Sequence, residues 1–163
     1  MSTLLRSSVL ALALGISTSA AAQTCEPFVA HGAGDTRSVS YINVGDPGPS
    51  RGDMRLGGRL LVDDDGNQLG AYSWILTMID QPDEDGRGTV QIKAYLELAG
   101  GQLVLETIVQ STGRLDDTDA VVVRPPIEYD VVGGTGIYET AVGTARLVVV
   151  GSDAVFVVDT VCE

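Results

Sequence analysis

Side chains that could perform hydrolysis or hold a metal ion are scarce in this chain. His31 is the only histidine, and it lies in the glycine-rich stretch 30–34. A hydrolytic triad requires a histidine held between a nucleophile and an orienting group, and a tetrahedral zinc site requires four ligands. One histidine and two cysteines cannot supply these sets. The sequence therefore predicts a solvated loop around His31, no metal site and no cofactor.

Three acidic turns, at residues 63–67, 83–86 and 116–119, could suggest a calcium site. An EF-hand loop has glycine at its sixth position and glutamate at its end, whereas glycine is the fourth residue of the first turn. We expect all three to be solvated hairpin tips. The glycine-rich run at residues 133–136 is no phosphate-binding loop either, because neither a Lys-Ser/Thr pair nor a helical pattern follows it.

A candidate ligand-binding surface lies on the strand expected over residues 70–79. The side chains of a strand alternate between its two faces. One face of this strand carries Tyr72, Trp74, Leu76 and Met78. Aromatic and large apolar side chains of this kind suit the wall of an apolar cavity, and ordinary core packing is the alternative interpretation.

Glu106 is a candidate acid or base on a later strand, expected over residues 103–110. If its carboxylate faces a cavity, desolvation raises its pKa and fits it for proton transfer. If it faces solvent, it is an ordinary surface carboxylate.

The elements that would position these residues are strands. Period-two alternation of apolar and polar residues dominates the chain, and helical periodicity is nearly absent. Eight strands are expected, at about residues 37–44, 54–63, 70–79, 88–98, 103–110, 127–133, 142–150 and 153–161. Turn residues rich in Gly, Asp and Asn join consecutive strands, which predicts an antiparallel all-β meander.

The first 22 residues have the three regions of a secretory signal peptide, with Arg6 followed by a short apolar stretch and then by small residues ending at Ala22. That stretch is shorter than the roughly 20 apolar residues of a membrane span. We therefore expect a signal peptide over 1–22, a lead-in over 23–36 and a single β-barrel domain over 37–163, secreted or periplasmic.

Two cysteines, Cys25 and Cys162, bracket the exported chain. In an oxidising compartment such a pair predicts a disulfide bond. The bond would bring the first and last segments together, as the closed sheet of an eight-stranded antiparallel up-and-down β-barrel does. Two free thiols in frayed ends are the alternative.

The formal net charge is −12, which disfavours binding to nucleic acid or to anionic lipid. An outer-membrane barrel would need two girdles of aromatic residues. Aromatic residues make up only 5% of the chain, which disfavours such a barrel.

Several strands are apolar on both faces, for example at residues 147–150. A second apolar face needs cover, so we expect a homo-oligomer, either a dimer or a trimer.

Residues 133–143, Gly-Gly-Thr-Gly-Ile-Tyr-Glu-Thr-Ala-Val-Gly, are the part of the chain closest to a known family. Together with residues 51–54 and the turn at 101–103, they resemble the allene oxide cyclase and dirigent barrel superfamily. The resemblance implies an eight-stranded antiparallel barrel, commonly trimeric. Its apolar cavity would fold a reactive small molecule before ring closure or coupling.

The resemblance also suggests site residues. Asn43 lies where the cyclases carry an asparagine that holds the substrate oxygen, and Tyr41 lies where they carry a glutamate. A second cavity asparagine falls on Gly58 and the cyclase cysteine falls on Leu76. A neutral phenol cannot supply the negative charge of that glutamate, so these departures argue against the allene oxide reaction itself.

The sequence thus predicts a barrel that binds a small hydrophobic molecule and acts as a cyclase or isomerase. Asn43 and Tyr41 would be polar anchors, Glu106 the acid or base, and the strand at 70–79 the wall. Orientation alone can lower a barrier by about 7 to 11 kcal/mol, so few polar groups are needed. The rival interpretation is a non-catalytic or dirigent-like ligand-binding protein, which converging polar groups inside the barrel would disfavour.

Overall fold

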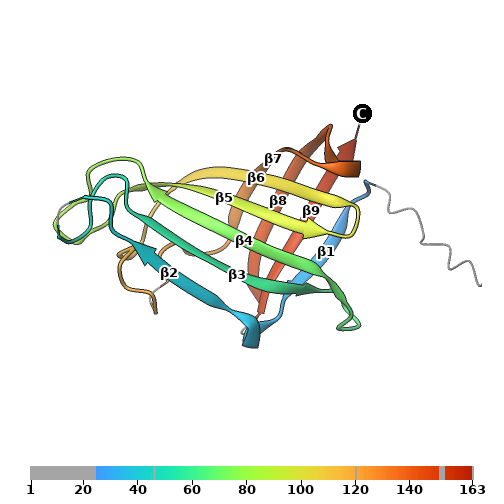
Figure 1. The fold of residues 1–163 in the computed structure, drawn as a ribbon, viewed down its shortest axis with the longest axis horizontal. Helices are drawn as coiled ribbons and strands as arrows, with labels where there is room; N and C mark the ends of the chain where they lie inside the picture. The colour runs from blue at the N-terminus through green and yellow to red at the C-terminus, as the bar shows by residue number, and fades with distance from the viewer. Residues whose placement is uncertain (1–24, 46, 120, 151–152, 163) are drawn as a thin grey trace, which may run out of the picture.

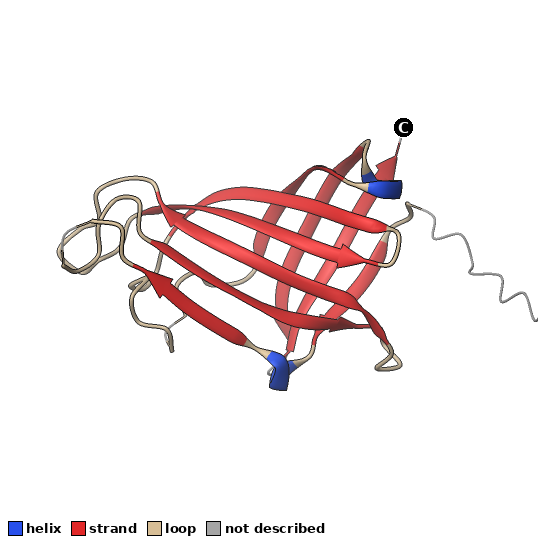
Figure 2. Cartoon of the chain, in the orientation of Figure 1, coloured by secondary structure: helices blue, strands red, loops and turns tan. Residues whose placement is uncertain are grey.

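The computed structural model describes residues 25–45, 47–119, 121–150 and 153–162. The expected signal peptide lies outside the described residues. Nine strands and two short 3-10 helices make up nearly all of the regular structure of the described residues (Figure 2). The strands are β1 (Phe28–Gly32), β2 (Ser38–Ile42), β3 (Met54–Val62), β4 (Gln68–Met78), β5 (Thr89–Leu98), β6 (Gly101–Gln110), β7 (Ile127–Gly134), β8 (Ala141–Val150) and β9 (Asp153–Cys162).

The strands form one antiparallel sheet that closes on itself. Consecutive strands pair from β2 through β9, and β1 pairs with both β9 and β3. Strands β1 and β2 lie one after the other along β3, so together they fill one position of the barrel. Figure 1 shows β2 to β6 running across the front, while β7 to β9 and β1 cross behind them at a steep angle. The predicted eight-stranded antiparallel barrel is confirmed.

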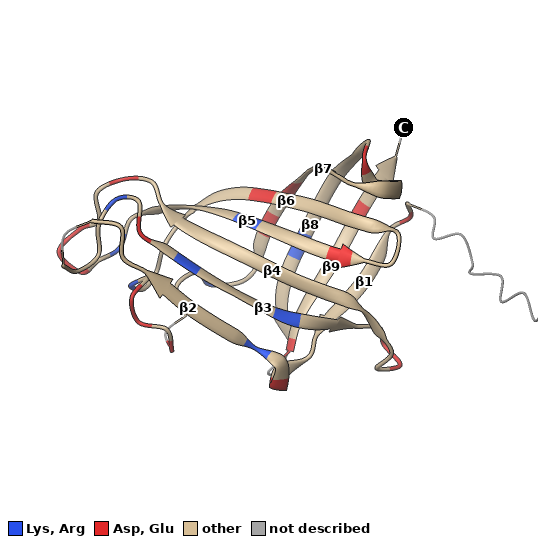
Figure 3. Cartoon of the chain, in the orientation of Figure 1, with Lys and Arg blue, Asp and Glu red and all other residues tan. Residues whose placement is uncertain are grey.

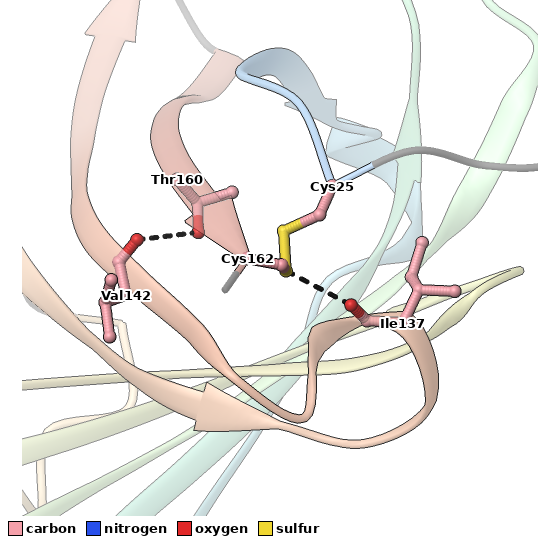
Figure 4. The surroundings of a disulfide bond; sticks show 5 residues. All are labelled: Cys25, Ile137, Val142, Thr160 and Cys162. Atoms are coloured by element: carbon pink, nitrogen blue, oxygen red, sulfur yellow. Dashed lines mark hydrogen bonds between the residues drawn. A yellow bond between two sulfur atoms is a disulfide. The ribbon is translucent and has the colours of Figure 1, made fainter.

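The disulfide bond between Cys25 and Cys162 is also present, with the two Cα atoms 5.8 Å apart (Figure 4). It joins the segment before β1 to the end of β9, next to the place where these two strands pair. Cys162 Sγ lies 3.1 Å from the carbonyl oxygen of Ile137, in the 3-10 helix Gly136–Tyr138. The two extremities of the described chain therefore meet at one end of the barrel.

The glycine corner after β7 allows two backbones to approach closely. A Cβ atom on Gly134 would lie 2.0 Å from the carbonyl oxygen of Gln102, and one on Gly136 would lie 2.3 Å from that of Gly100. Gly136 also has a positive φ of 62°. Glycine is required here because any side chain would separate the corner from the β5–β6 hairpin. Behind the corner, Tyr138 is 2% exposed and packs into the core.

Strand β1 differs from the expectation. It lies within the expected lead-in, and its sequence, Phe-Val-Ala-His-Gly, has little alternation to reveal it. Pairing with β9 on one side and with β3 on the other forms this strand, so tertiary contacts override a weak local signal. The expectation of a solvated loop around His31 is wrong. His31 lies on β1, with Nε2 2.8 Å from Asp64 Oδ1.

Two of the acidic turns are hairpin tips, as expected, and the third is not. Asp63 accepts hydrogen bonds from the backbone and side chain of Asn67, and Asp83 accepts one from the backbone of Arg87. Residues 116–119 instead belong to the long connection between β6 and β7. No group of three or more metal-ligating side chains is found among the described residues. No helix in that part of the chain is long and apolar enough to cross a membrane.

Candidate functional site

A pocket of about 230 Å³ lies inside the barrel, in the half that the β6–β7 connection covers. The other half is filled by side chains such as Leu61, Leu96, Leu103 and Phe156, each 0% exposed. Tyr72 separates the two halves, because it lines the pocket and its ring packs edge-on against Phe156 at 4.9 Å. The barrel is therefore solid at the disulfide end and hollow toward the other.

Strand β4 supplies the aromatic wall of the pocket through Tyr72, Trp74 and Leu76. Met78, the fourth residue of the predicted wall, shares their face and is 1% exposed, but it is not part of the pocket lining. The Trp74 indole lies over Gly57 of β3, where an added Cβ atom would come within 2.4 Å of the ring. Gly57 thus creates the space that Trp74 occupies.

Strand β3 adds charge to the same pocket. Arg59 follows Arg55 by four residues and Leu61 follows Arg59 by two, so both arginines share the inward face of the strand with that buried leucine. Figure 3 shows basic residues along β3. Arg55 is 2% exposed and Arg59 is partly buried. Arg37, directly before β2, is a third arginine in the lining. Burial, followed by the charge of Arg37, lowers the pKa of Arg55.

Arg55 fastens the β6–β7 connection across the pocket. Its Nη1 donates to the carbonyl oxygen of Asp117 at 2.8 Å, and its Nη2 donates to that of Thr118 at 2.7 Å. The residues that follow, Asp119 and the valines at 121–123, form part of the pocket lining. The mouth of the pocket is thus shaped by a loop that a buried arginine holds in place.

Two buried tyrosines belong to the pocket lining. Tyr72 and Tyr129 are 6% and 4% exposed and both line it. Burial raises the pKa of Tyr129, and the neighbouring Tyr72 raises it further. Burial also raises the pKa of Tyr72, although Arg59 and Arg37 act in the opposite direction. Both phenols therefore stay protonated at neutral pH and can donate a hydrogen bond to a ligand oxygen.

The two anchors suggested by the resemblance lie together at the end of β2, outside the pocket lining. Tyr41 donates to Asp53 Oδ2 at 2.6 Å, and Asn43 Oδ1 accepts from the backbone of Gly45 at 3.0 Å. Asp53, 1% exposed, also accepts hydrogen bonds from the backbones of Val44 and Ser50. This cluster orders the loop between β2 and β3.

Glu106 does not join these residues. It lies on the outer face of β6, where it accepts a hydrogen bond from Gln91 and forms an ion pair with Lys93 at 3.7 Å. Its neighbours Leu103 and Leu105 point the other way and are fully buried. The predicted wall on β4 thus lies inside the barrel, whereas Glu106 lies outside it.

The arginines and Tyr129 are pocket residues that our sequence analysis missed. A signal for the arginines was present, because Arg55 and Arg59 alternate in step with an apolar residue, Leu61, on one strand. Charged residues at inward-facing positions are exceptional in a barrel and therefore indicate a site. The loop residues Asp119 and 121–123 carried no such signal, since only the closed fold places them at the pocket.

No protein-family model matches the sequence, and no curated protein does. Solved structures do match its fold. A pyocyanin demethylase aligns at a TM-score of 0.60 and 17% identity, over 83% of this chain and 99% of its own. The Diels-Alderase AbmU from Streptomyces koyangensis aligns at 0.55 and 15%, over 86% of this chain and 63% of its own. The exo-specific intermolecular Diels-Alderase AbnU aligns at 0.52 and 17%, over 84% and 95%.

The chain spans less than two thirds of AbmU and nearly all of the other two proteins. At these identities the likeness concerns the course of the backbone. The chain therefore has the barrel fold that solved Diels-Alderases share, which is the kind of fold that the sequence resemblance implies.

Proposed function

We propose that the protein binds a small, largely apolar molecule in the barrel pocket and promotes its ring closure or isomerisation. The observation that carries this proposal is the pocket itself, with an aromatic wall on β4 inside a closed barrel. Its volume of about 230 Å³ exceeds the roughly 150 Å³ of an apolar cavity that admits benzene. A molecule of one or two rings fits this space.

The pocket suits catalysis by orientation. A rigid wall selects one folded conformer of a flexible molecule, which lowers the entropic part of the barrier. The hydroxyl groups of Tyr72 and Tyr129 add neutral donors that can stabilise charge developing on a carbonyl oxygen. Chemistry in a plain barrel cavity is also consistent with the solved neighbours, which are named as a demethylase and as Diels-Alderases.

Binding without turnover is the second candidate function. The observation that favours it is the position of Glu106 on the outer face, since the predicted acid or base is not in the cavity. Turnover of a bound candidate substrate separates the two functions, because a binding protein returns the molecule unchanged.

Extraction of the purified protein with organic solvent, followed by mass spectrometry, tests the proposal. We expect a small apolar molecule to co-purify with the wild-type protein but not with Ala94→Phe, because Ala94 is 1% exposed and lines the pocket. Lys93→Gln, on the opposite face of the same strand, is the matched control. If neither extraction nor a panel of apolar probes reveals binding to the folded wild-type protein, the proposal fails.

Export and self-association are parts of the same proposal. Cleavage after Ala22 would be seen in the intact mass of protein recovered from the periplasm or medium.

The outer face pairs exposed valines across neighbouring strands, Val29 with Val157 and Val142 with Val161. A second copy of the chain would remove these apolar side chains from water. Light scattering that gave a monomer mass at all concentrations would contradict the homo-oligomer.

A further inference from the structure

The pocket carries positive charge although the chain as a whole is strongly acidic. Three arginines line it, namely Arg37, Arg55 and Arg59, against one carboxylate, Asp119. The formal net charge of the chain is −12. Charged groups that line a site of low dielectric and oppose the charge of the surrounding protein indicate the charge of the ligand. An apolar ligand alone would not require this arrangement.

Arg55 has a buried donor left over after it has fastened the loop. Its two terminal nitrogens donate to Asp117 and Thr118, but its Nε is buried and has no hydrogen-bond partner among the described residues. A buried guanidinium N–H without an acceptor is costly. Since the side chain is 2% exposed and lines the pocket, a ligand inside the barrel can supply the acceptor.

Arg59, four residues further along β3, also has a buried donor without an acceptor in the described chain. Its Nη1 is buried and likewise has no partner in the described part of the chain. Its Cδ would lie 3.2 Å from a Cβ atom added to Gly32, so its stem lies beside β1. Ser38 pairs with Gly58, which places Arg37 beside Arg59 on the neighbouring strand. Like charges opposite each other destabilise a sheet unless an anion lies between them.

We propose that the ligand of the pocket carries a carboxylate, which Arg55 and Arg59 bind with their free N–H groups while its apolar body lies against Trp74 and Leu76. The inference rests on the proposed function, because it assigns the substrate class of the same pocket. Guanidinium groups are suited to planar oxyanions, which they bind through charge-assisted hydrogen bonds. The pocket volume limits the acid to a compact aryl or unsaturated carboxylate.

The test compares two probes of nearly equal shape, cinnamate and cinnamamide, by titration calorimetry on the oxidised wild-type protein. Quenching of Trp74 gives a second readout inside the pocket, because it is the only tryptophan in the chain. We expect cinnamate to bind at least about tenfold more tightly than cinnamamide, as charge-assisted hydrogen bonds to a buried guanidinium predict.

The variants identify the group responsible. Arg59→Gln is expected to abolish the preference for cinnamate, and Arg59→Lys to retain part of it. Arg146→Gln is the matched control, because Arg146 lies on the outer face of β8 and pairs with Glu128 at 2.8 Å. This control is expected to keep the full preference, which excludes a general effect of net charge.

Three outcomes would overturn the inference. If wild-type protein binds both probes equally, or if Arg59→Gln keeps the preference for cinnamate, the carboxylate assignment fails while the apolar pocket stands. If neither probe binds to the wild-type protein or quenches Trp74, the proposed function fails together with the inference. The comparison on wild-type protein does not depend on the folding of any variant.

Discussion

At the scale of single residues, Gly57 decides whether the aromatic wall can form. A Cβ atom at this position would meet both the Trp74 ring and the backbone carbonyl oxygen of Ser38 at 2.4 Å. The ring could turn away, but the carbonyl belongs to the pairing of β2 with β3 and cannot. We expect Gly57→Ala to reduce the free energy of unfolding by about 1 to 3 kcal/mol, the usual cost of overpacking.

Urea unfolding and the emission spectrum of Trp74 measure this effect, and the spectrum should shift as the ring moves. Gly34→Ala is the matched control, since Gly34 is exposed and has no atom within 4 Å of an added Cβ. Equal stability of the two variants would show that the wall does not depend on the small residue.

Another residue-scale prediction concerns Asp53 and the pH dependence of stability. Burial acts to raise its pKa, but hydrogen bonds from Tyr41, Val44 and Ser50 outweigh burial and lower the pKa below its ordinary value. A lowered carboxyl pKa in the folded state stabilises the fold above the ordinary value near 4, and this stabilisation is lost as the pH falls through the folded-state pKa. The free energy of unfolding should therefore fall as the pH drops below about 5.

Asp53→Asn should make that decline shallower and cost about 2 to 3 kcal/mol at pH 7, because charge-assisted hydrogen bonds to a buried carboxylate are lost. Urea titrations across the pH range, with the exposed Asp65→Asn as control, provide the comparison. Parallel stability curves for wild type and Asp53→Asn would show that another carboxylate controls the acid response.

At the scale of elements, the strands could be predicted because their pattern is local. β3 to β9 lie within about two residues of the expected ranges, since each strand alternates in step with the inside and outside of the barrel. Two parts of the site could not be predicted in this way. β1 acquires its structure from two partners, and the β6–β7 connection reaches the pocket through hydrogen bonds from Arg55, 62 and 63 residues away in sequence.

That connection gives a prediction at the same scale. Arg55→Met should leave the barrel intact but release the loop, because the methionine can fill the buried site without bonding to Asp117 or Thr118. We expect amide hydrogen exchange in residues 112–124 to become at least about tenfold faster, while β4 and β5 exchange as before. Equal acceleration in all these segments would instead mean that Arg55 supports the whole fold.

At the scale of the whole molecule, the disulfide links the closure of the barrel to its environment. Cys25 and Cys162 are 137 residues apart in sequence, so the bond constrains almost the entire unfolded chain. The chain-entropy estimate for loops of this length is roughly 4 to 5 kcal/mol. The total free energy of unfolding of a typical domain is about 5 to 15 kcal/mol, so the disulfide bond would supply a large part of it. The oxidised form should thus be stable mainly in compartments that preserve disulfide bonds.

Reduction should lower the free energy of unfolding by roughly 4 kcal/mol, and the double variant Cys25→Ser/Cys162→Ser should behave like the reduced wild type. Urea unfolding with and without a reductant measures the loss, and hydrogen exchange locates it. β1 should lose protection first, because it has five residues and closes the barrel between β9 and β3. A loss below about 1 kcal/mol, with β1 still protected, would mean that strand pairing alone closes the barrel.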